Sequence, residues 1–140
     1  MSFTIETTIL AQLQADGTLT TLLIGGIHNE VQIDRQKTES AFDSQTKELL
    51  PCANLKLETE LPYGPLDDSN RAFITIMFYD RAGYSTIEQA RARVYTLLHR
   101  QTFTGITEVR HADDVPRAWD DALDCYLILS RYQVTRSTKQ

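Results

Sequence analysis

The chain has 140 residues, of which 41% are hydrophobic and 24% are charged, and its formal net charge is −5. This length and composition are typical of a single globular domain, here 1–140, whose core needs neither disulfides nor a metal ion. The acidic balance excludes a general DNA-binding protein, because such a protein presents a cationic surface to the phosphates.

Local features of the sequence argue against a membrane, secreted or zinc protein. No apolar run reaches the roughly 18 residues of a membrane helix. The N-terminus "MSFTIETTILAQLQADG" lacks the basic and continuous apolar regions of a signal peptide. Cys52 and Cys125 each lie in an apolar run, show no zinc-ligand spacing, and are expected to be reduced thiols in the core. We therefore expect a protein without metal or other cofactor that is made in a cytosol, or packed into a particle there.

The first half of the chain predicts two helical segments, a short strand and a polar loop. Residues 3–15 place their isoleucines and leucines on one helical face, and 19–24 form one or two further helical turns that end at a Gly-Gly pair. Residues 27–33 alternate imperfectly and predict a short strand. Residues 34–50 are mostly polar, so we expect a loop insertion that is partly disordered in the isolated protein. The excess of acidic residues lies in the stretch from residue 30 to residue 70, which holds nine acids and four bases. The remaining residues hold ten of each.

The second half predicts mainly strands, interrupted by one helix. Alternating or dense apolar residues indicate strands at 53–60, 72–79, 105–111 and 123–134. An amphipathic helix is expected over 85–100, where the sequence "STIE" matches a capping box formed by Ser85 and Glu88. The remaining segments are expected to be an acidic turn at 113–124 and a loose tail at 135–140.

The order of these elements predicts an α+β fold. Neighbouring strands joined by turn-like links imply a largely antiparallel sheet of about four or five strands, with the two main helices on one face. The strand at 72–79 is apolar on both faces. It is therefore expected at the centre of the sheet, or with its second face covered by a neighbouring subunit.

The sequence contains no recognisable catalytic motif. Nucleophile elbows, phosphate loops, dinucleotide-binding loops and zinc-protease helices are all missing. The three Asp-Asp pairs beginning at Asp67, Asp113 and Asp120 are interpreted as solvated turn residues, with weak divalent-cation binding as the alternative. Arg91, Arg93 and Arg100 are capable of meeting phosphates, but a solvated helix face or a salt-bridged subunit surface suits this acidic chain better.

The residue patterns of several segments resemble those of a known family of phage proteins. A helix containing "ILAQLQAD" leads into "LTTLLIGGIHNEV", and a strand follows a proline in "LPCANLKLETE". An apolar strand then runs through an aromatic and glycine junction into a helix, "ITIMFYDRAGYSTIEQARARVYTLL", and the chain closes with the strand "DCYLILSRYQV". In these features the chain resembles the tail-completion or tail-terminator proteins, the head–tail joining proteins of long-tailed bacteriophages, although the 34–50 segment departs from the family pattern.

The resemblance implies a structural virion protein rather than an enzyme. Such proteins form a ring, commonly a hexamer, at the head-proximal end of the tail tube, where they stop tube polymerisation and present a face to the head connector. The implied partners are further copies of the chain, the tail tube protein and the connector or stopper protein, and DNA passes through without specific binding. The alternative is another head–tail adaptor or a non-enzymatic protein-binding module with the same α+β fold.

A closed ring needs two different contact patches on each copy. The candidate subunit or partner interface residues are Phe42, Phe73, Thr75, Met77, Tyr79, Arg91 and Arg93.

Glu58 and Glu60 are the candidate acids for the bore of the ring, where they would repel DNA phosphates from the wall. Charge reversal at both positions is expected to make the assembled ring retain DNA, because the added lysines attract phosphates. Unchanged DNA retention in a pull-down with the assembled ring would contradict this placement.

Overall fold

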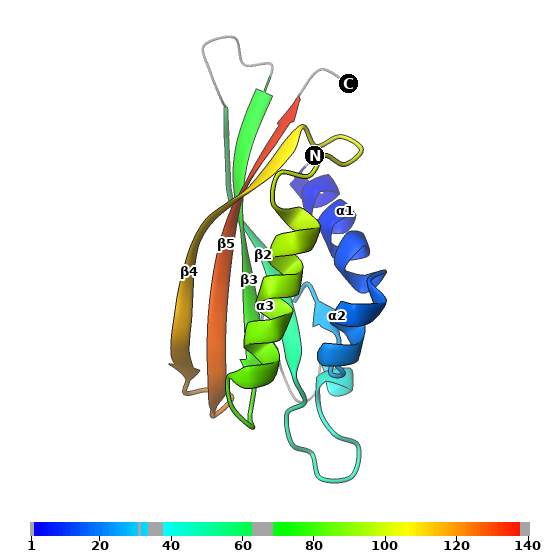
Figure 1. Ribbon diagram of the computed structural model, residues 1–140, viewed down its shortest axis with the longest axis vertical. Coiled ribbons are helices and arrows are strands. Elements are labelled where there is room, and N and C mark those ends of the chain that lie inside the picture. The colour runs from blue at the N-terminus through cyan, green and yellow to red at the C-terminus, as the bar shows by residue number, and fades with distance from the viewer. Residues whose placement is uncertain (1, 31, 34–37, 63–68, 138–140) are drawn as a thin grey trace.

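The structure, a computed structural model, describes residues 2–30, 32–33, 38–62 and 69–137, with side chains from residue 5 onward except 59–62, 69–70 and 137. Two helices come first, and a third helix separates two pairs of long strands (Figure 1). The elements are α1 Ser2–Gln14, α2 Gly17–Leu22, β1 Ile27–His28, a 3-10 turn Glu39–Ala41, β2 Cys52–Pro62, β3 Ser69–Asp80, α3 Ser85–Leu98, β4 Glu108–Asp120 and β5 Cys125–Ser137.

The strands form one five-stranded sheet in the order β1-β2-β3-β5-β4. Three of the four pairings are antiparallel, and only the two-residue β1 pairs in parallel with β2. The helices lie together on one face of this sheet (Figure 1). The predicted α+β class, the largely antiparallel sheet and the one-sided helices are thereby confirmed.

The core lies between the sheet and the helices. Because side chains alternate between the faces of a strand, Ile74, Ile76 and Phe78 of β3 point together into this core and are fully buried. They meet helical residues that recur every three or four positions, the spacing of one helix face. The buried helical residues are Ile5, Ile9 and Leu13 of α1, Leu19 of α2, and Ile87, Ala90, Val94 and Leu98 of α3. The central position predicted for β3 is confirmed.

Three predicted elements have the wrong extent. The strand expected over 27–33 is paired only at Ile27–His28. The segment expected to be an acidic turn, 113–124, mostly continues the strand β4 as far as Asp120. Two register shifts, between His111 and Asp113 and between Val115 and Ala118, break the period-two alternation that would have identified this strand from the sequence. The final strand also runs further than expected, since β5 reaches Ser137, and residues 138–140 lie outside the described residues.

The predicted capping box does not form. The residue before α3 is Tyr84, in a right-handed helical conformation, and no side chain caps the helix there. Ser85 is already the first helical residue, and the carboxylate of Glu88 instead accepts a hydrogen bond from Arg117 of β4 at 3.0 Å.

The turn between α1 and α2 is held by Asp16, which serves two elements at once. Its Oδ2 accepts a hydrogen bond from the backbone N–H of Leu19 at 2.9 Å and so caps α2. The same carboxylate accepts two hydrogen bonds from the guanidinium of Arg93 in α3, at 2.7 and 2.9 Å. These hydrogen bonds hold the pKa of Asp16 below its usual value, because they favour the charged carboxylate. The ion pair fixes α2 against α3.

The Gly-Gly pair brings α2 against the start of β2. A Cβ atom on Gly25 would lie 2.9 Å from the carbonyl oxygen of Pro51, and the backbone N–H of Gly25 donates to that same oxygen at 2.8 Å. Gly26 has a φ of +92°, a left-handed conformation that favours glycine. The sequence therefore needs both glycines here for backbone geometry.

Candidate functional site

The sheet face opposite the helices is divided into a covered part and an open part. The open face is defined here by the half-buried or exposed residues that point away from the helices: Lys56 of β2, Phe73, Thr75 and Met77 of β3, Leu129 and Arg131 of β5, and Asp113 and Val115 of β4. Thr75 points to the same face but is buried. It is only 5% exposed, because it lies between its register neighbours Lys56 and Arg131.

The segment 38–50 covers the other part of this face. It carries the short 3-10 turn and a bridge between Phe42 and Leu49, with a tight turn in which Oδ1 of Asp43 accepts two backbone hydrogen bonds. Its apolar side chains join a second core formed by Ile33, Ala41, Phe42, Leu49, Cys52, Tyr79 and Cys125. The described part of the expected polar loop is thus packed against the sheet, and residues 34–37 lie outside the described residues.

This second core contains two of the candidate interface residues. Phe42 and Tyr79 are 8% and 5% exposed, so they pack within their own chain. Both cysteines are buried and free there, as expected, and burial raises the pKa of Cys125 to about 12, which keeps the thiol protonated and poorly reactive.

The open face combines an apolar centre with an arginine that is paired with an aspartate on the neighbouring strand. Met77 and Leu129 are register partners, and Val115 lies beside Leu129 on the outer strand. Arg131 makes two hydrogen bonds to Asp113, at 3.1 and 3.2 Å, and its guanidinium also lies 5.2 Å from the ring centre of Phe73. Such a surface is suited to contact with another protein, because it offers apolar area and an arginine that is held in place by Asp113.

The two candidate arginines on α3 are engaged inside the chain. Arg93 holds Asp16, as described above. Nη1 of Arg91 donates to Oδ2 of Asp114 on β4 at 3.3 Å. The structure therefore uses both side chains to fix α3 against its neighbours, and the sequence could not reveal this because the partners are 77 and 23 residues away.

Asp114 is the centre of a polar network between α3 and the sheet. Its Oδ1 accepts a hydrogen bond from Ser130 Oγ at 2.7 Å and lies 2.9 Å from Nε2 of His111. Ser130 and His111 share one carboxylate oxygen, so the histidine is not placed to take a proton from the serine, as a nucleophilic triad requires. The network packs beneath Tyr95, whose ring contacts that of His111. Its geometry is that of a structural network.

Ionisation of Asp114 is controlled by this environment. Burial raises the pKa of the carboxyl, but hydrogen bonds from His111 and Ser130 and the charges of His111 and Arg91 lower it by more. The pKa therefore lies below its ordinary value of 3.8.

The candidate bore acids are only partly described. Glu58 is exposed and lies where β2 shifts its register against β3, between Leu57 and Thr59. The side chain of Glu60 lies outside the described residues.

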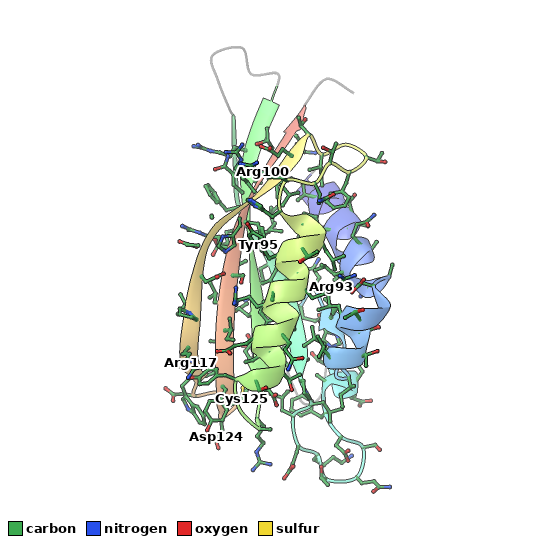
Figure 2. All side chains as sticks on the ribbon, in the orientation of Figure 1. Arg93, Tyr95, Arg100, Arg117, Asp124 and Cys125 are labelled. Atoms are coloured by element: carbon green, nitrogen blue, oxygen red, sulfur yellow. The ribbon has the colours of Figure 1, made fainter. Side chains whose placement is uncertain are left out.

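Sequence reasoning missed the strongest surface signals, which are exposed large apolar side chains. Ile24 is 63% exposed, Trp119 48%, Val115 47% and Tyr95 41%. The sequence alone could have identified Trp119, as an aromatic residue within an otherwise acidic and polar stretch. Figure 2 labels Arg117 on β4, and Trp119 follows two residues later in the sequence.

The described part of the chain holds no group of three or more His, Cys, Asp or Glu residues that could bind a metal ion. Among the same residues, no helix has the length and apolar character needed to cross a membrane.

Solved structures share the fold of this chain. No protein-family model and no curated protein sequence matches the chain. A chain in the structure of the virion of a native gene transfer agent particle superposes with a TM-score of 0.66 at 15% sequence identity. The match covers 94% of this chain and 92% of that chain. The two chains therefore share a fold over nearly their whole lengths.

We predict that Asp114→Asn destabilises the protein at pH 7 by about 1 to 3 kcal/mol, because the charged hydrogen bonds in the network are weakened. Because the pKa of Asp114 is lowered in the folded state, the ionised carboxylate contributes its full stabilisation of the fold above about pH 4. This stabilisation is lost as the pH falls through the pKa of the folded state. Urea unfolding of the wild type and of Asp114→Asn, from pH 7 to pH 3, measures this loss. The difference between their free energies of unfolding should shrink at the acidic end.

The matched control is Asp113→Asn on the same strand, whose carboxylate is exposed and pairs with the exposed Arg131. Asp113→Asn should change the free energy of unfolding by no more than about 1 kcal/mol, as for other surface ion pairs. Equal destabilisation by the two variants would contradict the structural role of Asp114.

Proposed function

We propose that this protein is a structural component of a phage-type virion. The single observation that carries the proposal is the match over nearly the full length of both chains to a protein of a gene transfer agent virion. The shared fold spans 94% of this chain and 92% of the virion chain.

Within the virion, we propose that the protein is the tail terminator. It forms a ring on the head-proximal end of the tail tube, ends tube polymerisation and presents a docking face to the head connector. This finer role is supported by the sequence resemblance, which lies in the strand-to-helix junction now seen as β3 and α3. The ring is assembled in the cytoplasm of the bacterial host, and its partners are its own copies, the tube protein and the connector.

A non-enzymatic role agrees with the arrangement of the polar groups. The best-defined constellation, around Asp114, is satisfied by its own neighbours and lies between α3 and the sheet. The open face and the exposed apolar side chains instead offer surfaces for protein contacts, which a ring between two other assemblies requires. We propose that Glu58 and Glu60 face the bore, where DNA passes.

The proposal predicts a closed oligomer. Light scattering coupled to size-exclusion chromatography across a range of concentrations should give one species near six copies, which negative-stain images should show as a ring. The ring should persist in high salt if its seams are mainly apolar, because salt screens charges and leaves apolar burial intact.

A strict monomer that remains monomeric in the presence of tail tubes would contradict the ring. A monomer that instead binds a small ligand or one partner protein would favour the alternative, a protein-binding module.

A further inference from the structure

An exposed tryptophan lies at the end of β4, on the same side of the sheet as the helices. Trp119 is the register partner of Tyr126, whose side chain packs against the main core, so both point to the helix side. Nearly half of the tryptophan is exposed, at 48%. Val115 of the same strand is exposed to a similar degree, but it pairs with Leu129 and belongs to the open face. Trp119 therefore marks a surface that is separate from the open face.

Three aromatic rings and an arginine form this surface, which we call the aromatic cluster (Tyr84, Arg117, Trp119 and Tyr126). The ring of Tyr126 lies edge-on to both others, with its centre 5.1 Å from that of Trp119 and 4.9 Å from that of Tyr84. The hydroxyl of Tyr84 donates to the carbonyl oxygen of Ala118 at 2.7 Å. The guanidinium of Arg117 lies 5.0 Å from the ring centre of Tyr84. These contacts hold Trp119 in place before a partner binds, which lowers the entropy cost of association and is typical of an interface anchor.

The aromatic cluster lies at an acidic end of the molecule, which is formed by residues 43–48, 80–88 and 117–124. Figure 2 labels Arg117 and Asp124 at this end and Arg100 at the opposite end. Each of the three basic residues in these segments already has an acidic neighbour in them: the pairs are Arg81 with Glu48, Arg117 with Glu88, and Lys47 with Asp43. The acids beyond these pairs are Asp80, Asp120, Asp121 and Asp124. This end therefore carries an excess of negative charge.

Two of these four aspartates are available to a partner. Asp80 is buried, and Oδ1 of Asp120 accepts a hydrogen bond from the backbone N–H of Leu123 at 2.8 Å inside the turn. Asp121 and Asp124 are exposed, and no described residue forms an ion pair with either of them. Asp124 borders a small cavity together with Lys47 and Arg81, but neither base pairs with it.

The negative potential of this end extends into the protein. Burial is the main cause that raises the pKa of Cys125, and the charges of Asp120, Asp80 and Asp124 raise it further. Several aspartates thus act together at one place, and the cations of this end do not cancel them.

These charges favour a basic protein as the partner. DNA is repelled, because its phosphates are negative. A second copy of the chain is also disfavoured, since its net charge is −5 and many of its arginines are occupied. The arginines that are ion-paired within the chain are Arg81, Arg91, Arg93, Arg110, Arg117 and Arg131. A different protein with lysines or arginines on its surface complements both the aspartates and the tryptophan ring, which attracts cations.

We propose that the aromatic cluster, together with Asp121 and Asp124, is the docking surface for a basic segment of a neighbouring virion protein. Trp119 packs against an apolar stem or an arginine of the partner, and the two aspartates pair with its basic side chains. The inference rests on the proposed function for the identity of the partner, and it assigns that contact to the acidic end of the molecule.

The test measures binding of two purified probes, the cognate tail tube protein and the cognate head connector protein, to the immobilised full chain. Trp119→Ser removes the apolar anchor and should weaken the binding of one of them roughly 30-fold. Val115→Ser is the matched control, because Val115 is similarly exposed on the same strand but faces the other side of the sheet. It should leave the affinity for that same protein unchanged. Circular dichroism checks that both variants fold.

Asp121→Asn combined with Asp124→Asn tests the charges. Asp124 has a φ of +54°, a conformation that asparagine accepts, so the two changes remove charge without straining the turn. Wild-type affinity should fall as the salt concentration rises from roughly 0.05 to 0.5 M, because salt screens exposed charges. The double variant should bind more weakly at low salt and lose most of this dependence. Glu108→Gln, at the other end of β4, is the control and should retain it.

Weaker binding by Trp119→Ser and by the double asparagine variant, with both controls intact, supports the docking surface. A wild type that binds neither probe contradicts the proposed function, and the inference with it. Wild-type binding that survives both changes overturns the inference alone. Tighter binding by the double asparagine variant overturns the choice of a basic partner. Loss of the wild-type oligomer in Trp119→Ser, with unchanged affinity for both probes, assigns the aromatic cluster to a second copy and also overturns that choice.

Discussion

The structure depends on one constraint, the apolar character of both faces of β3. Ile74, Ile76 and Phe78 on one face are covered by the helices, which pack only on that side. Met77 and Tyr79 on the other face need a different cover. The chain supplies this cover in part, by folding the 38–50 segment back on the end of the sheet where β3 finishes and β5 begins.

What remains uncovered then determines where partners can bind. The open face is stabilised within the chain by the Arg131–Asp113 pair and by the arginine packed against Phe73. Arg91 and Arg93 are similarly occupied, because they fix α3 against β4 and α2. The large apolar side chains that the described part of the fold leaves in water are Ile24 after α2, Tyr95 on α3, and Val115 and Trp119 on β4. Exposed apolar side chains of this kind are available for contacts with other proteins.

The sequence predicted what depends on regular periodicity. β3 and α3 were placed correctly because their apolar residues repeat every two or every three to four positions. The predicted strand over 105–111 found only the start of β4, because the register shifts and Pro116 interrupt the alternation beyond it. The capping box failed because the helix begins one residue before the place that the motif requires. The burial of Phe42 depends on Cys52, Tyr79 and Cys125, which are distant in sequence, so composition alone suggested a polar loop. Of the candidate site residues, the strand positions could be assigned to a face, but the internal partners of Arg91 and Arg93 required the tertiary structure.

The central claim is that the protein closes the end of a growing tail tube. Electron microscopy of tubes polymerised from the cognate tube protein, with and without this protein, tests it most directly. The account predicts a ring at one end of each tube and tubes that stop lengthening once it is bound. Tubes that continue to grow at their normal rate, or protein bound along their length with no preference for an end, would contradict it.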